Sequence, residues 1–283
     1  MFNQKPMFNQ KRGANLLANY LILLLLAAFA LGPLVILGFN SVKERSEIAA
    51  NPLGPPNEIH LENFSEAWRV GKFANTVTNS VILVVATVIA ELIFAGMAAY
   101  SLSRLSPPGH NIFMFYMLVG STLPIWLFLV PLFSLWRMLG LINSLFGLIL
   151  LYTAFNSPFA IFLLRSFMVQ VPKDFDDAAR VDGANMWQVF TRVLLPLTWP
   201  GFLTVGLIVG LGVWSEFQIA LIFVSDPDLF PVTTSYYNFT SRFSRDWSLT
   251  SAAAVIMIAP ILLLFLGLQR RFIDGLTQGG LKG

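Results

Sequence analysis

Long apolar stretches constrain this chain more than any other feature of its sequence. A helix needs about 20 apolar residues to cross the roughly 30 Å hydrocarbon core of a bilayer. We expect about six such helices, at approximately Leu16–Phe39, Val77–Leu102, Ile112–Leu135, Leu145–Phe167, Phe202–Phe223 and Ala252–Leu268. Only 12% of the residues are charged, whereas soluble domains average about 25%. The sequence therefore predicts an all-α membrane protein that lies in the lipid bilayer.

Basic residues close to the predicted spans indicate the orientation of the chain. Three of them precede the first span with no acidic residue among them, and Arg270 and Arg271 follow the last span. An even number of spans places both termini on the same side, which the excess of Lys and Arg predicts to be the cytoplasm. We expect cytoplasmic tails at 1–15 and 269–283, and a single transmembrane domain at 16–268.

One polar stretch, DFDDAARVDGANMWQVFTRVLLPLTWP, lies between the predicted fourth and fifth spans. Asp174 is placed to cap a helix, with Asp177 three residues later as the acid of a capping box. Gly183 is typical of the turn that ends a helix. Asn185 is placed to cap a second helix, with Gln188 three positions on. The pattern predicts a helix, a tight turn and a helix on the cytoplasmic face.

Two interpretations are compatible with this polar stretch. In the first, it is an amphipathic linker that rests on the lipid headgroups. However, it carries four aspartates, while helices that lie on a membrane surface usually present Lys and Arg. Its small residues also leave a smooth profile that a partner protein could enclose. These two features favour the second interpretation, a contact with another protein.

The pattern D-A-A-R-V-D-G-A at 177–184, followed by L-L-P at 194–196, resembles the signature loop of ABC importer permeases. The resemblance is to the carbohydrate branch, and within it to the smaller, inner permease of maltose-type transporters. Four more segments resemble that branch and occur in the same order along the chain: AAYSLSRL (98–105), GLINS (140–144), WSEFQIALIF (214–223) and LQRRFIDGLTQGGLKG (268–283). The resemblance implies a type I importer permease fold with a coupling helix-turn-helix at about 169–197.

The resemblance also implies partners and a docking site. The loop would dock into an ATPase subunit through Asp177, Ala178, Ala179, Arg180, Asp182, Gly183, Ala184 and Pro196. Asp177 stands where the family usually has glutamate, so its salt bridge to the ATPase is expected to be longer or water-mediated. The other implied partners are a second homologous permease, a second ATPase subunit and an extracytoplasmic solute-binding protein. The implied location is the bacterial plasma (inner) membrane.

Several activities are not supported by the sequence. The phosphate-binding motif G-x-x-x-x-G-K-[ST] is absent, so ATP and Mg²⁺ are expected to be bound by the partner ATPase. There is no cysteine, and the two histidines are not at metal-ligand spacing. No catalytic, cofactor-binding or metal-binding residue is therefore predicted, and the chain is expected not to be an enzyme. The sequence contains no run of Lys and Arg that would indicate binding to nucleic acid.

Polar residues inside the predicted spans are the candidates for the substrate pathway. Ionisable groups inside a membrane usually face a bundle interior or a watery cavity. Glu91 and Glu216 are such groups, and Trp214 and Gln218 lie beside Glu216. An indole beside polar groups suits a sugar. The alternative is that each carboxyl is a buried structural group.

We therefore predict a permease subunit of an ATP-driven, binding-protein-dependent sugar importer. The alternative function is an ion-coupled secondary transporter in which Glu91 or Glu216 carries a proton. Pro124, Pro131 and Pro158 lie inside the predicted third and fourth spans. They either kink these helices or serve as passive packing features.

Overall fold

The computed structural model describes residues 8–243 and 245–280, and every regular element in these ranges is helical. The predicted all-α fold is thereby confirmed. The chain divides into two compact units: residues up to Gly71 with Phe239–Ile256, and Lys72–Asn238 with the residues from Met257 onward. Parts of the expected tails, at 1–7 and 281–283, lie outside the described residues.

The first unit contains α1 (Phe8–Ser41), α2 (Arg45–Ala50), α3 (Glu62–Val70) and the start of α14 (Trp247–Gly280). Its most unusual feature is Lys43, whose side chain is fully buried. Lys43 Nζ donates hydrogen bonds to Asn40 Oδ1 at 3.3 Å and to the carbonyl oxygens of Asn51 and Gly54, both at 2.7 Å. These bonds hold the connection between α2 and α3 against the end of α1.

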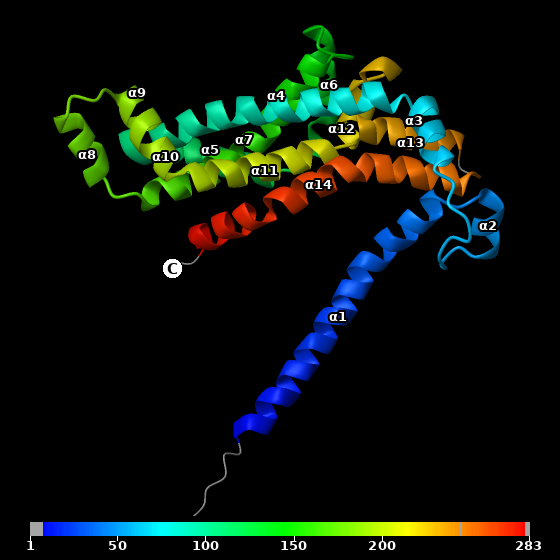
Figure 1. The fold of residues 1–283 in the computed structure, drawn as a ribbon. Coiled ribbons are helices and arrows are strands. Elements are labelled where there is room, and N and C mark those ends of the chain that lie inside the picture. The colour runs from blue at the N-terminus through cyan, green and yellow to red at the C-terminus, as the bar shows by residue number, and fades with distance from the viewer. Residues whose placement is uncertain (1–7, 244, 281–283) are drawn as a thin grey trace, which may run out of the picture. The chain divides into compact units, whose positions relative to one another are not determined.

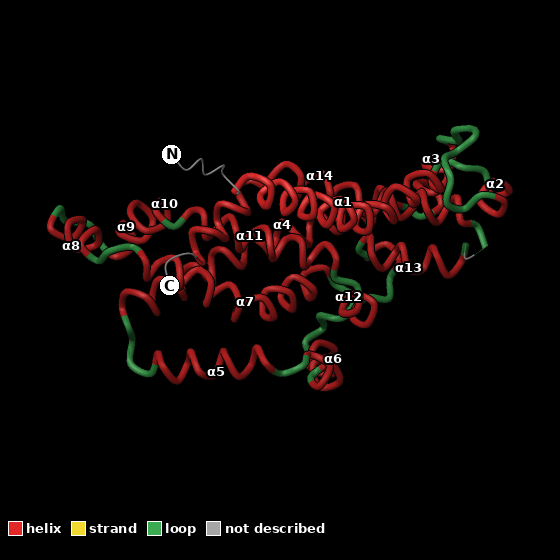
Figure 2. The backbone as a smooth tube through the Cα atoms, turned by 90° about the horizontal axis from the view of Figure 1, so that it is seen from below, coloured by secondary structure: helices red, strands yellow, loops and turns green. Residues whose placement is uncertain are grey.

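The second unit is built on α4 (Phe73–Tyr100), α7 (Leu145–Gln170) and α11 (Trp199–Ser215), which pack along one another (Figures 1 and 2). Buried residues on α4 recur every three or four positions and so occupy one face of the helix. They include Thr76, Ser80, Leu83, Thr87, Glu91, Ala95 and Ala99. Most are small or polar, which is typical of membrane helices that pack closely.

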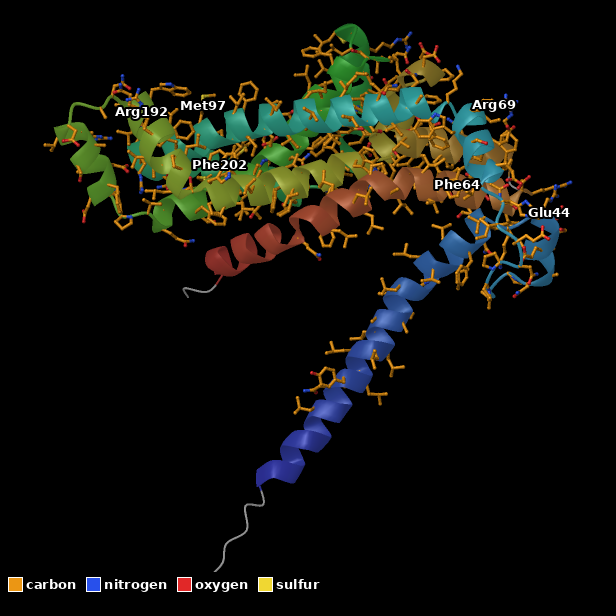
Figure 3. The ribbon with its side chains drawn as sticks, in the orientation of Figure 1. Glu44, Phe64, Arg69, Met97, Arg192 and Phe202 are labelled. Atoms are coloured by element: carbon orange, nitrogen blue, oxygen red, sulfur yellow. The ribbon has the colours of Figure 1, made fainter. Side chains whose placement is uncertain are left out.

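Glycines allow aromatic rings to lie directly against these core helices. A Cβ atom at Gly96 would lie 2.9 Å from the ring of Phe202, and one at Gly201 would lie 2.7 Å from the ring of Phe167. Both separations are shorter than van der Waals contact, so any larger residue would displace the ring. Figure 3 shows Met97 and Phe202 at the same end of this unit.

The continuous third span predicted at 112–135 is wrong. The chain instead forms α5 (His110–Thr122), the short 3₁₀-helix η2 (Ile125–Leu127) and α6 (Leu129–Met138). At 1.5 Å per residue, the 13 residues of α5 extend about 20 Å, which is less than a bilayer core. The cause is Pro124, because a residue that precedes proline avoids the helical conformation, and Leu123 is extended with ψ 130°.

The fifth span predicted at 202–223 is also interrupted, since α11 ends at Ser215 and α12 (Gln218–Phe223) begins after a break. Among the described residues, four helices are long and apolar enough to cross a membrane. They contain Asn19–Ser41, Phe73–Leu105, Leu145–Gln170 and Trp247–Gly267. Met186–Leu197 and Trp199–Ser215, bent by 77°, make a fifth if they are counted as one span. After α12 the chain continues through η4 (Pro227–Leu229) and α13 (Val232–Arg242).

Candidate functional site

A polar elbow, residues 171–189, connects the end of α7 to the segment that leads into α11 (Figure 1). Its first arm is α8 (Asp174–Val181), and its second arm begins with α9 (Met186–Val189). The predicted helix, turn and helix are therefore present. The π-helix η3 (Phe190–Leu194) and α10 (Leu195–Leu197) follow.

The start of α8 differs from the prediction. Lys173 stands at the N-cap, no side chain caps the helix, and Asp174 is already the first helical residue. The predicted capping box of Asp174 and Asp177 is therefore wrong. Because Lys173 itself adopts helical dihedral angles, the chain turns one residue earlier than the capping pattern requires. The three aspartates of the first turn still lie at the positive end of the helix dipole.

The turn of the elbow and the start of its second arm agree with the sequence prediction. Gly183 has φ +85°, and its N–H donates to Arg180 O at 3.0 Å while Ala184 N–H donates to Ala179 O at 2.9 Å. This pair of bonds is a Schellman motif, which ends a helix with a left-handed residue. Beyond it, Asn185 and Gln188 form the predicted capping box, with bonds of 2.9 and 2.8 Å.

Most residues predicted to dock an ATPase are accessible on this elbow. Asp177, Ala178, Arg180, Asp182 and Gly183 are exposed, and Ala179 and Ala184 are half-buried. Pro196 is exposed but lies outside the elbow, on α10.

Sequence reasoning missed two groups of residues here. The first is a set of exposed apolar side chains on the elbow: Phe175, Val181, Met186 and Trp187. Large apolar groups in an otherwise polar stretch were the available signal, because exposed apolar patches mark contact surfaces. The second group is Asp176 with Arg104, which form a buried ion pair. No local pattern indicates it, since the two residues are far apart in sequence.

A cavity of about 860 Å³ lies within the second unit, between residues of α5, α7 and the α11–α12 break. Its wall combines apolar side chains with the polar residues Ser121, Tyr152, Asn156, Ser157 and Glu216. Hydroxyl, amide and carboxylate groups of this kind can exchange hydrogen bonds with a polyhydroxylated ligand.

Glu216 occupies the break between α11 and α12. Its Oε1 accepts a hydrogen bond from Ile219 N–H at 2.7 Å, and its Oε2 accepts from Ala220 N–H at 3.2 Å. Tyr152 O–H, from α7, donates to Oε2 at 2.7 Å. The carboxylate thus satisfies backbone donors at the start of α12 and ties the break to α7, while it also faces the cavity.

The other predicted pathway residues lie in different places. Glu91 is fully buried behind the cavity wall, where Ser157 Oγ lies 3.5 Å from its Oε2. Trp214 faces away from the cavity, since its Nε1–H donates to Met257 O at 3.2 Å. Gln218 is exposed on α12 and does not line the cavity.

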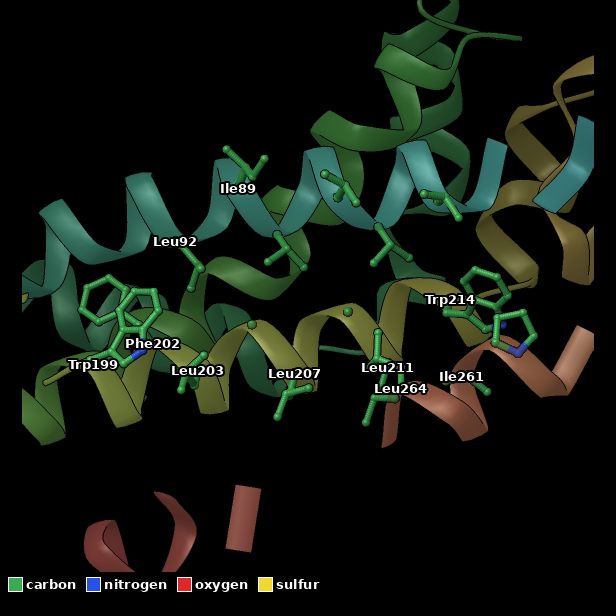
Figure 4. A pocket seen from close by; sticks show the side chains of 17 residues that line it. Ile89, Leu92, Trp199, Phe202, Leu203, Leu207, Leu211, Trp214, Ile261 and Leu264 are labelled. Carbon is green, nitrogen blue, oxygen red and sulfur yellow. The ribbon is translucent and has the colours of Figure 1, made fainter. Parts of the chain in front are cut away.

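Trp214 instead lines a second, apolar pocket of about 450 Å³ between α4, α11 and α14. Figure 4 shows Trp199 and Trp214 at opposite ends of this pocket, with leucines between them. Apart from the two tryptophan N–H groups, the lining side chains carry no hydrogen-bonding group, so the pocket does not suit a sugar. Across the described ranges, no group of three or more His, Asp or Glu side chains could hold a metal ion.

Comparisons with known proteins agree with this architecture. Residues 91–278 match the family described as "Binding-protein-dependent transport system inner membrane component". The chain is 34% identical to the diacetylchitobiose uptake system permease protein NgcG of Streptomyces coelicolor, over 92% of this chain and 87% of that protein. It is 31% identical to the trehalose transport system permease protein SugB of Mycobacterium tuberculosis, over 92% and 95% of the two chains.

A solved structure shares the fold. It belongs to a bacterial ABC transporter involved in the import of the acidic polysaccharide alginate. The TM-score is 0.81 at 22% identity, and the alignment covers 95% of this chain and all of that one (100%).

Proposed function

The chain belongs to the family of binding-protein-dependent transport system inner membrane components, and we propose that it is the permease subunit of an ATP-driven importer of mono- or oligosaccharides. The named relatives carry diacetylchitobiose and trehalose. The polar cavity beside Glu216 supports a substrate with many hydroxyl groups. The exposed polar elbow supports docking to a separate ATPase that binds ATP and Mg²⁺.

The proposed assembly contains this chain, a second homologous permease, two ATPase subunits and an extracytoplasmic binding protein. Both termini and the polar elbow would face the cytoplasm. Closure of the ATPase dimer would displace the elbow, and α7 and α11 would tilt with it, so that the cavity opens alternately to the two sides. The observation that carries this proposal is the accessible helix-turn-helix between two core helices.

Reconstitution into proteoliposomes tests the proposal. Sugar uptake by the full assembly is expected to require ATP, the ATPase subunits and the binding protein. Uptake by this chain alone, driven by a proton gradient without ATPase, would overturn it in favour of ion-coupled transport.

Glu216 provides a more specific prediction about the cavity. Glu216→Gln is expected to retain more than half of the uptake, because the amide oxygen still accepts a bond at the start of α12. Glu216→Ala leaves buried donors without a partner, at a cost of about 1–3 kcal/mol, and uptake is expected to fall about tenfold. Uptake per purified complex is the measurement. Loss of activity in Glu216→Gln as complete as in Glu216→Ala would indicate that the charge itself is required.

A further inference from the structure

Asp176 differs from the other aspartates of the polar elbow because it is buried. Its relative exposure is 4%, while Asp174, Asp177 and Asp182 are exposed. The cation that faces it is Arg104, also buried, whose Nε lies 2.8 Å from Asp176 Oδ2. A lone charge in such a position is strongly disfavoured, so each group requires the other.

The same guanidinium binds a second element. Arg104 Nη2 donates a hydrogen bond of 2.7 Å to the carbonyl oxygen of Val171, the residue that directly follows α7. Arg104 belongs to η1 (Ser101–Leu105), the π-helix that continues α4. One side chain therefore joins the end of α4 to the end of α7 and to the first turn of α8. The Nη2 bond to Val171 is directional, whereas the contact with Asp176 is a close ion pair in which the Nε–H is not aligned for a hydrogen bond.

A neighbouring contact ties α4 to the other arm of the elbow. Tyr100 O–H donates to the carbonyl oxygen of Met186, the first residue of α9, at 3.2 Å. The Tyr100 ring also packs on Phe190, with the ring centroids 5.2 Å apart. Both arms of the elbow are thus held by the end of the α4 segment.

We propose that Arg104 and Asp176 are positioning residues that make α4 move with the polar elbow. The proposal rests on the proposed function, in which an ATPase displaces the elbow. The chain connects the elbow covalently only to α7 and to the segment before α11. Because α4 packs along both helices, core packing transmits part of their motion, and the Arg104–Asp176 pair adds a direct link between the end of the α4 segment and the elbow. A buried ion pair is often no more stabilising than apolar residues of similar volume. The pair, together with the Arg104 Nη2 bond to Val171, nevertheless holds the first turn of α8 close to the end of the α4 segment.

The test compares variants of the assembled transporter in proteoliposomes, with ATP hydrolysis and sugar uptake measured on the same preparation. Arg104→Met alone leaves Asp176 as an unpaired buried charge, so the variant can fail to fold. The decisive variant is therefore the double replacement Arg104→Met with Asp176→Leu, which leaves no buried charge. The matched control is Asp174→Asn, an exposed aspartate in the same helical turn.

The double variant is expected to assemble and to hydrolyse ATP within about twofold of the unmodified transporter, while sugar taken up per ATP falls about tenfold. The single variant Asp176→Glu, which keeps both charges, is expected to retain part of that ratio, and Asp174→Asn to leave it unchanged. An unchanged ratio in the double variant would overturn the positioning role. An unmodified assembly that neither hydrolyses ATP nor takes up sugar would instead overturn the proposed function.

Discussion

Replacing Gly183 by valine is expected to reduce ATP-driven sugar uptake about tenfold or more. Gly183 has φ +85°, a conformation that costs an L-residue about 1–2 kcal/mol and is worst for a β-branched side chain. Steric crowding is not the cause, because an added Cβ atom would meet no atom within 4 Å. The strain would break the Schellman motif and change the angle between α8 and α9. The surface that the elbow presents would then no longer match an ATPase that docks on it.

A matched control separates this local effect from a general effect on the backbone. Gly140 has φ +70° and also has no neighbour within 4 Å of an added Cβ atom, but it lies between α6 and α7. Gly140→Val is therefore expected to suffer the same strain and still retain uptake within about twofold. Equal loss of uptake in both variants would mean that the elbow has no special role.

Replacing Lys43 by methionine is expected to destabilise the connection between α2 and α3, so that it opens locally more often. Methionine fills a similar volume but leaves the carbonyl oxygens of Asn51 and Gly54 without their buried donor. Hydrogen bonds to charged groups contribute about 1.5–3 kcal/mol each. We expect the free energy of local opening to fall by about 3 kcal/mol or more, measured by hydrogen exchange of the backbone amides in 42–61.

Lys72→Met is the control for the Lys43 prediction. The Lys72 side chain is 62% exposed and forms one ion pair with Asp228 at 3.0 Å. Exposed pairs of this kind contribute about 0–1 kcal/mol, so its loss is expected to change local opening by no more than that. Equal protection of residues 42–61 before and after Lys43→Met would show that the buried ammonium does not hold this connection.

The sequence correctly predicts those structural features that are determined by residues close to one another in the chain. Gly183 and the Asn185–Gln188 pair define the turn and the second arm of the elbow within a few residues, and the structure contains both features. Long apolar stretches predict the longest helices for the same reason. Pro124 carries the signal for the broken third span, but a proline inside an apolar stretch is compatible with both a kink and a break. Pro158 illustrates this, because α7 continues through it.

Features that depend on distant residues could not be predicted. The ion pair of Arg104 and Asp176 joins η1 to the first turn of α8, and α5, η2, α6 and α7 lie between them in the sequence. The cavity likewise requires α5, α7 and α11 to be placed together. Trp214 and Glu216 are separated by one residue in the sequence, yet Trp214 lies in the last turn of α11 while Glu216 follows the helix with an extended backbone (ψ 134°) in the break. They therefore face the apolar pocket and the polar cavity, respectively.

Photo-cross-linking from the polar elbow tests the central claim, that a separate ATPase binds this part of the chain. The chain contains no cysteine, so Ala178→Cys provides one thiol for a photoactivatable label on the exposed face of α8. A control label is carried by Leu53→Cys, at a residue that is 70% exposed in the first unit. Illumination in native membranes is expected to join the Ala178 label, and not the Leu53 label, to the co-expressed ATPase. Adducts of the Ala178 label with lipid alone would contradict the account.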